Sequence, residues 1–129
     1  MNKIKVKQLF PSKRNTLIST LVRIGTLNIL IDCGLDYNFT ESYIQQYKKE
    51  ATDIDIILIS QSDFRHIGAL PIVYKMNPNC KIYTTDPVGK YGYLSMIETI
   101  EIQKSIGKHY YIRKKDVEDI LSSKNMIFV

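Results

Sequence analysis

The sequence predicts an α/β fold, because apolar runs of strand length alternate with segments of helical spacing along the chain. Residues 54–59 form the most apolar run, IDIILI, which we expect to be a strand covered on both faces of its sheet. The opening residues 3–7 alternate strictly between lysine and apolar side chains, a pattern that predicts a half-buried strand. Residues 41–50 are expected to form a short helix, with Thr40 as its N-cap.

Shorter apolar runs predict the remaining strands. The runs 17–24 and 27–32 are joined at Gly25 and Thr26, which predicts a hairpin. Two further strands are predicted at residues 80–84 and 126–129. Because native domains rarely end within a strand, we expect residues 1–129 to be a truncated part of one domain.

Three more helices are predicted from spacing and start signals, at residues 66–76, 86–106 and 115–122. The first is expected despite Pro71 near its start. In the second, Asp86 as cap followed by Pro87 is typical of a helix start. Its apolar stripe is expected to pack in the core, and comprises Tyr91, Leu94, Met96, Ile97 and Ile100.

The composition is that of one ordinary globular domain. The chain has 129 residues, a net charge of +5 and 44% apolar residues, which excludes an intrinsically disordered chain. Its apolar runs are far shorter than the roughly 20 residues that span a bilayer, and its start lacks a signal-peptide pattern. We therefore expect a cytoplasmic or nuclear protein in which Cys33 and Cys80 are buried free thiols. The scattered basic clusters are expected to be solvated surface.

Polar side chains that could carry chemistry follow two of the predicted strands. The run ending at Ile59 is followed by the polar cluster 60–66, SQSDFRH, and the run ending at Ile31 is followed by Asp32. Ligand sites of α/β folds lie at the carboxyl ends of strands. The other histidine, His109, has no acidic or histidine partner at ligand spacing and is expected at the surface.

These segments resemble the metallo-β-lactamase/β-CASP superfamily, whose signature is a strand, then Ser-His-x-His-x-Asp-His-x-Gly-Ala-Leu, then a helix. Ser60, Gly68-Ala69-Leu70 and the strand-end element 30–34, LIDCG, carry the resemblance. Within the superfamily the chain is most similar to the non-nuclease subunits of cleavage and polyadenylation specificity factor. The resemblance implies the N-terminal part of a metallo-β-lactamase-like αββα sandwich.

The resemblance also implies a degenerate metal site, at positions that hold Gln61, Asp63, Arg65 and His66, with Asp32 as a supporting residue. Gln61 offers only a neutral oxygen, and Arg65 is permanently charged and repels a divalent ion. We therefore expect no catalytic residue, no metal and no cofactor. We further expect the Arg65 guanidinium to form an ion pair with Asp63 or Asp32, and His66 to be a hydrogen-bonded helix-start histidine.

The function implied by the resemblance is that of a non-catalytic scaffold subunit in pre-mRNA 3′-end cleavage and polyadenylation. Implied partners are the active nuclease homologue, as a heterodimer, and other processing subunits, with a nuclear location, possible pre-mRNA contact and no membrane. Three alternatives stay open. One is an inactive subunit of the Integrator complex, and another is a metal-dependent hydrolase that uses Asp32, Asp63 and His66. The third is direct RNA binding through the basic loops, with an affinity that falls steeply with salt.

Overall fold

The computed structural model describes residues 3–11, 16–107 and 112–129. Its strands form one six-stranded sheet in the order β1-β2-β3-β4-β5-β6. The strands are β1 (Ile4–Gln8), β2 (Thr20–Ile24), β3 (Leu27–Ile31), β4 (Ile56–Leu58), β5 (Lys81–Thr84) and β6 (Met126–Phe128). The first three are antiparallel neighbours, and β3 to β6 are parallel neighbours.

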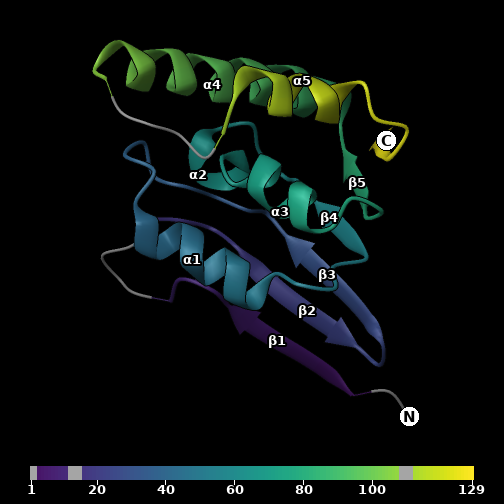
Figure 1. Ribbon diagram of the computed structural model, residues 1–129. Helices are drawn as coiled ribbons and strands as arrows, with labels where there is room; N and C mark the ends of the chain where they lie inside the picture. The colour runs from purple at the N-terminus through teal and green to yellow at the C-terminus, as the bar shows by residue number, and fades with distance from the viewer. Residues whose placement is uncertain (1–2, 12–15, 108–111) are drawn as a thin grey trace.

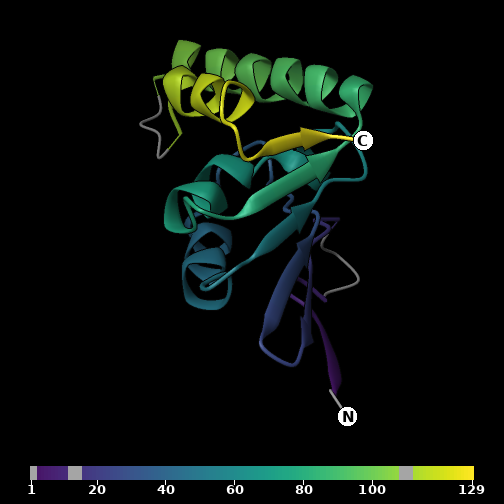
Figure 2. The ribbon, with the colours of Figure 1, turned by 90° about the vertical axis from the view of Figure 1, so that its right-hand side faces the viewer.

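Helices fill the connections between the parallel strands. The helices are α1 (Glu41–Glu50), α2 (Phe64–Ile67), α3 (Leu70–Met76), α4 (Asp86–Ser105) and α5 (Lys114–Leu121). Each new parallel strand is added at the same edge, so right-handed crossovers place all the helices on one face of the sheet. Figures 1 and 2 show this arrangement, with α1, α3, α4 and α5 stacked along one side of the strands.

The two faces of the sheet differ sharply in burial. Leu21, Leu30, Ile57 and Ile82 are register partners on the helix-covered face and are at most 3% exposed. The opposite face is also apolar, but Val6 is 65% exposed and other members of its rows are only half-buried. Those rows comprise Val6, Val22, Ile29, Ile56, Ile31, Leu58, Tyr83 and Ile127. The core of this chain therefore lies between the sheet and the helices.

The α/β class and the predicted strands are confirmed, with three corrections to burial and length. The first strand is exposed along its whole length, because it is an edge strand without a covering helix. The strand predicted at 54–59 spans only Ile56–Leu58. It is covered by helices on one face, and Leu58 on the other face is 36% exposed. In the predicted hairpin, residues 17–19 precede β2 instead of forming part of it.

The helices differ from their predicted bounds and burial more than the strands do. The helix predicted at 66–76 is two helices, α2 and α3, separated at Gly68-Ala69. In α4 the N-cap is Thr85, whose hydroxyl accepts from the Val88 N–H, and Asp86 is the first helical residue. Met96 and Ile100 pack in the core and Ile97 packs against it, as predicted, whereas Tyr91 and Leu94 are 64% and 57% exposed. Small residues, Gly89 and Gly92, are buried instead.

Both cysteines are buried free thiols, as predicted. Burial raises the pKa of Cys80 to about 11 and raises that of Cys33 well above its usual value. Both sulfurs are therefore neutral at physiological pH. The predicted surface position of His109 lies outside the described residues.

Candidate functional site at the carboxyl ends of β3 and β4

The polar segments lie together at one edge of the sheet. Strands β3 and β4 are parallel, so Asp32 and the segment 60–66 leave the sheet at the same edge. The Asp32 N–H donates to the Leu58 carbonyl at 2.8 Å, which extends the ladder by one bond beyond β3. The prediction that these residues gather at a strand tip is therefore confirmed.

Asp32 fixes the path of the chain where it leaves β4. Its two carboxylate oxygens accept from the Ser60 N–H at 2.8 Å and from the Ser60 hydroxyl at 2.7 Å. Its carbonyl accepts from the Ser19 hydroxyl at 2.8 Å. The side chain is 4% exposed and the backbone is left-handed, with φ at 60°. Both carboxylate oxygens of Asp32 therefore hold Ser60 in place.

Backbone hydrogen bonds hold the segment after Asp32 against α2. Cys33 N–H donates to the His66 carbonyl at 2.8 Å, and Leu35 N–H donates to the Phe64 carbonyl at 3.1 Å. Gly34 lies between them, and a Cβ atom there would stand 1.6 Å from the Arg65 carbonyl oxygen. Only glycine permits this approach of two backbones. The α2 segment is therefore held rigidly by its main chain while several of its side chains face outward.

His66 and Asp63 contact each other within this segment. The His66 Nδ1 lies 2.7 Å from the Asp63 Oδ1, and the two atoms form an ion pair when the imidazole is protonated. Their relative orientation does not meet hydrogen-bond geometry, and Nδ1 has no other hydrogen-bond partner in the described part of the chain. The predicted helix-start position of His66 is confirmed, while its predicted hydrogen bond is replaced by this ionic contact.

The predicted ion pair of Arg65 is wrong. No carboxylate of the described residues lies within 4.0 Å of its guanidinium, because Asp63 turns to His66 and Asp32 to Ser60. The guanidinium instead lies over the Tyr37 ring, with the central carbon 6.0 Å from the ring centroid. Tyr37 in turn stacks on Phe64 at 5.6 Å. This is a cation–π arrangement at the surface, outside the core.

Gln61 is exposed at the start of the same segment, and its side chain forms no hydrogen bond with another of the described residues. Tyr37, Ser19 and Tyr47 also belong to this region and were not singled out from the sequence. The Tyr47 hydroxyl donates to the Gly34 carbonyl at 2.6 Å, and burial raises the pKa of Tyr47 well above its usual value. Each of the three comes from a segment distant from 60–66, and no sequence pattern links them to it.

The superfamily that the sequence resembles implies a zinc centre at this edge, and such a centre requires a particular set of donor side chains. Zinc takes Cys, His or carboxylate ligands, with at least three from the protein in catalytic sites. Across residues 3–11, 16–107 and 112–129, no three His, Cys, Asp or Glu side chains are grouped so as to hold a metal. Asp32, Asp63 and His66, the ligands of the hydrolase alternative, are therefore not assembled as a set. The side chains of this segment do not fit a zinc site.

The sheet, with its parallel crossovers on one face and a polar loop at the carboxyl ends of β3 and β4, is compatible with a domain of the metallo-β-lactamase type. Residues 21–127 match the family model of the metallo-beta-lactamase superfamily domain. The chain belongs to this superfamily, and the resemblance drawn from the sequence is confirmed.

Known relatives agree with this assignment. The chain is 34% identical over 99 residues to the probable cleavage and polyadenylation specificity factor subunit 2 of Drosophila melanogaster, covering 76% of this chain and 13% of that protein. It is 33% identical over 102 residues to the cleavage and polyadenylation specificity factor subunit 2 of Arabidopsis thaliana, covering 78% of this chain and 14% of that protein. The chain thus spans about one seventh of these relatives.

One relative bears another name, and solved structures agree on the fold. The Integrator complex subunit 11 of Danio rerio is 36% identical over 75 residues, covering 52% of this chain and 12% of that protein. A Thermotoga maritima protein assigned to the metallo-beta-lactamases is 20% identical, with a TM-score of 0.51, and covers 98% of this chain and 58% of that one. A flavo di-iron protein of the same organism has a TM-score of 0.51 at 16% identity, covering 100% and 33%.

None of the helices in the described parts of the chain has both the length and the apolar character needed to cross a bilayer.

Proposed function

We propose that this chain is part of a non-catalytic subunit of the pre-mRNA 3′-end cleavage and polyadenylation machinery, in which the metal site of the superfamily is degenerate. The subunit acts as a scaffold in the nucleus. Its partners are the active nuclease homologue, with which it forms a heterodimer, and other subunits of the same complex.

The environment of Arg65 is the observation that carries this proposal. Arg65 stands at the position that the superfamily signature gives to an acidic ligand, and a guanidinium neither coordinates zinc nor loses its charge. Its place over Tyr37 keeps this cation at the site without neutralising it by a carboxylate. At position 65 a metal-bound water would meet a guanidinium, which can neither accept its proton nor replace an acidic ligand.

The hydrogen bonds between Asp32 and Ser60 support a structural role for the strand-tip loop at this edge of the sheet. Both carboxylate oxygens of Asp32 are used in hydrogen bonds of 2.7 to 2.8 Å, and the neighbouring backbone is locked to α2. The arrangement maintains the shape of a strand-tip loop and leaves Gln61 and Arg65 exposed on it. Such a surface suits recognition of a partner better than chemistry on a substrate.

The names of the relatives support the choice of process. Subunits named for cleavage and polyadenylation specificity factor match most of this chain in fly and plant, and a yeast relative is named cleavage factor two protein 2. Because the chain spans a small part of those proteins, the test requires the full protein from its own cell.

Affinity purification tests the proposal directly. The full protein, tagged in its native cell and purified from nuclear extract, is expected to bring with it a metallo-β-lactamase nuclease homologue and polyadenylation subunits, identified by mass spectrometry. The similarity to an Integrator subunit makes that complex the second candidate. Recovery of Integrator subunits without polyadenylation subunits would favour it, and recovery of neither set would refute both.

A further inference from the structure

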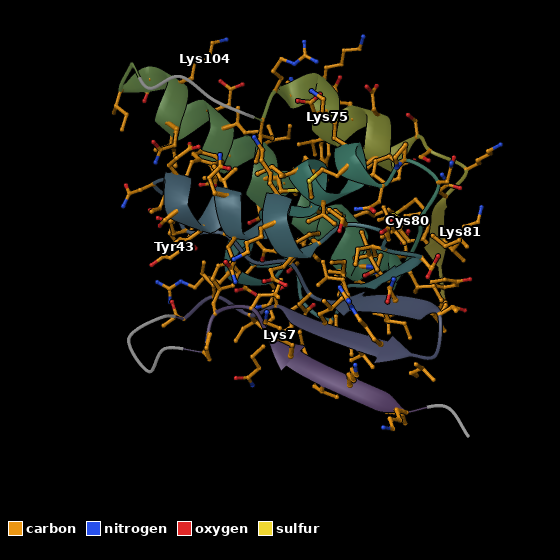
Figure 3. The ribbon with its side chains drawn as sticks, turned by 60° about the horizontal axis from the view of Figure 1, so that its bottom comes forward. Lys7, Tyr43, Lys75, Cys80, Lys81 and Lys104 are labelled. Carbon is orange, nitrogen blue, oxygen red and sulfur yellow. The ribbon has the colours of Figure 1, made fainter. Side chains whose placement is uncertain are left out.

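A second surface, on the β1 side of the sheet, concentrates positive charge at the free edge. Lys5 pairs with Arg23 across the β1–β2 ladder and Lys7 pairs with Leu21, so all four side chains lie on the face that carries the helices. Together with Glu50 they line a hollow of about 200 Å³. Figure 3 shows Lys7 on the side of β1 that faces α1. We call this hollow the β1–α1 basic groove.

Among the described residues, Glu50 is the only acidic residue that lines the groove, and it pairs with Lys7. The Lys7 Nζ lies 3.0 Å from the Glu50 Oε1. The hydrogen bond from Lys7 lowers the pKa of Glu50, burial raises it by less, and the charges of Lys7, Lys49 and Arg23 lower it further. Glu50 is therefore ionised at neutral pH and offsets one of the cations around it. Lys5, Arg23 and Lys49 have no ion-pair partner among the described residues.

The structural roles of lysine on a fold explain only part of this charge. Lysines on an edge strand discourage pairing with another chain, which accounts for Lys5 and Lys7 on β1. Lys49 lies in the last turn of α1, where a cation is favourable next to the helix dipole. Arg23 fits neither role, because β2 is paired on both sides. Its position opposite Lys5 places like charges directly across the ladder, an arrangement that costs stability.

The spacing and chemistry of the cations suit a repeating phosphate backbone. Lys5 and Lys7 are two residues apart on one face, about 6.8 Å along the strand. Arg23 adds a planar guanidinium, which binds phosphate oxygens through two parallel hydrogen bonds. The groove is lined by Leu21, one acid and three cations, and by no aromatic side chain that could stack a base. It is therefore built to bind a backbone without reading its sequence.

We infer that the β1–α1 basic groove binds the phosphodiester backbone of single-stranded RNA. Lys5, Arg23 and Lys7 contact successive phosphates. The choice of RNA among polyanions rests on the proposed function, whereas the phosphate-binding chemistry of the groove does not. The groove thus gives the scaffold a contact to its RNA that is separate from the strand-tip loop.

The test measures binding of the full protein to a fluorescein-labelled oligouridine by fluorescence anisotropy, between about 50 and 200 mM salt. The double variant Lys5→Glu with Arg23→Glu removes two phosphate contacts. Its affinity is expected to fall by about tenfold or more at physiological salt. The slope of log affinity against log salt is expected to become shallower by about 1.4, because each contact to a single strand contributes about 0.7.

A second basic cluster provides a control with the same change in net charge. Lys114→Glu with Lys115→Glu reverses two exposed lysines at the start of α5, where acids are compatible with the helix dipole. This variant is expected to keep the wild-type affinity and slope. Circular dichroism and urea unfolding establish that both variants are folded. An equal loss in both would refute the groove, and so would unchanged binding by the Lys5→Glu, Arg23→Glu variant.

Two further measurements separate RNA from other polyanions and from the proposed function. Polyglutamate at equal charge concentration is expected to compete poorly, and equal competition would overturn the choice of a nucleic acid. The Lys5→Glu, Arg23→Glu variant is expected to co-purify with the same processing subunits as the wild type. If that purification fails for the wild type while the RNA result holds, the proposed function is refuted and the groove is not.

Discussion

Asp32 is the residue on which the geometry of the strand-tip loop depends most. It is buried, its backbone is left-handed, and its carboxylate holds both polar groups of Ser60. Asparagine keeps an acceptor oxygen and tolerates the left-handed region, whereas alanine does neither. Asp32→Asn therefore removes the charge and keeps the shape of the side chain, whereas Asp32→Ala removes both.

We expect Asp32→Ala to lower the free energy of unfolding by about 2–3 kcal/mol, because it leaves the Ser60 donors without their acceptor. Asp32→Asn is expected to cost less than about 1 kcal/mol, since the amide can bond to both Ser60 groups. Urea unfolding of both variants checks this. Equal losses in the two would show that Asp32 is needed for its charge, against the positioning role described here.

Arg65 provides a second test at the scale of one residue. Its guanidinium is exposed and lies over Tyr37, and exposed cation–π contacts contribute about 0.5–1 kcal/mol. Arg65→Ala is therefore expected to lower stability by no more than about 1 kcal/mol. A loss of about 3 kcal/mol or more would contradict this environment of Arg65, because an exposed cation–π contact does not contribute that much.

The sequence was sufficient to place Asp32 and the segment 60–66 at one strand edge, because polar residues after two buried strands meet wherever those strands are parallel neighbours. It was not sufficient to find the partners. Tyr37 comes from the loop before α1, which backbone hydrogen bonds such as Leu35 N–H to the Phe64 carbonyl hold against α2. Contacts of this kind depend on how loops pack, and no local pattern encodes them.

At the scale of elements, α5 is fixed by a reciprocal cap at its start. The Asp116 carboxylate accepts from the Arg113 N–H at 2.9 Å and from its guanidinium at 3.2 Å. The Asp116 N–H donates in return to the Arg113 carbonyl at 2.9 Å. Burial raises the pKa of Asp116, but the hydrogen bonds from Arg113 and the charges of Arg113 and Lys75 together outweigh burial and lower it overall. The ionised carboxylate is thus favoured in the folded state.

This lowered pKa makes the stability of α5 depend on pH. The contribution of Asp116 is present above its unfolded pKa, about 3.9, and is lost as the pH falls through the lower folded value. We expect Asp116→Asn to cost about 0.5–1 kcal/mol at pH 7, and nothing at a pH below both values, where the wild type is also uncharged. Urea unfolding at the two pH values checks this. A cost that is independent of pH would contradict the role of the charge.

Helix ends were the part of the elements that sequence predicted least well. Gly68 and Ala69 separate α2 from α3, because the Ala69 N–H donates to the Cys33 carbonyl at 2.8 Å instead of continuing the helical hydrogen bonds of α2. Thr85 and Asp86 are both good caps, and only the Val88 N–H decides between them. The existence of each helix followed from spacing, whereas its ends followed from tertiary contacts.

The whole molecule is a sheet covered by helices on one face. The nearly continuous apolar runs of the inner strands predict two apolar faces, but they do not say which face is covered by helices within this chain. The order in which parallel strands are added decides this, because every crossover then lies on the same side (Figure 2). For that reason the strand at 54–59 was predicted with two covered faces and has one.

Substitutions on the two faces are expected to differ strongly in cost. Leu30→Thr on the covered face is expected to lower stability by about 3 kcal/mol, because it buries a hydroxyl and leaves a cavity. Ile29→Thr, its neighbour on the uncovered face, is expected to cost less than about 1.5 kcal/mol, because that side chain is only half-buried. Urea unfolding of the two variants tests the assignment, and equal costs would show that both faces are covered in this chain.

The central claim is that the strand-tip loop of this superfamily member does not hold a catalytic zinc ion. Its most direct test is elemental analysis of the full protein, expressed in zinc-supplemented medium and purified without chelator. We predict far less than one zinc per chain, unchanged in the His66→Ala variant. One zinc per chain that is lost on His66→Ala or Asp63→Ala would contradict the account.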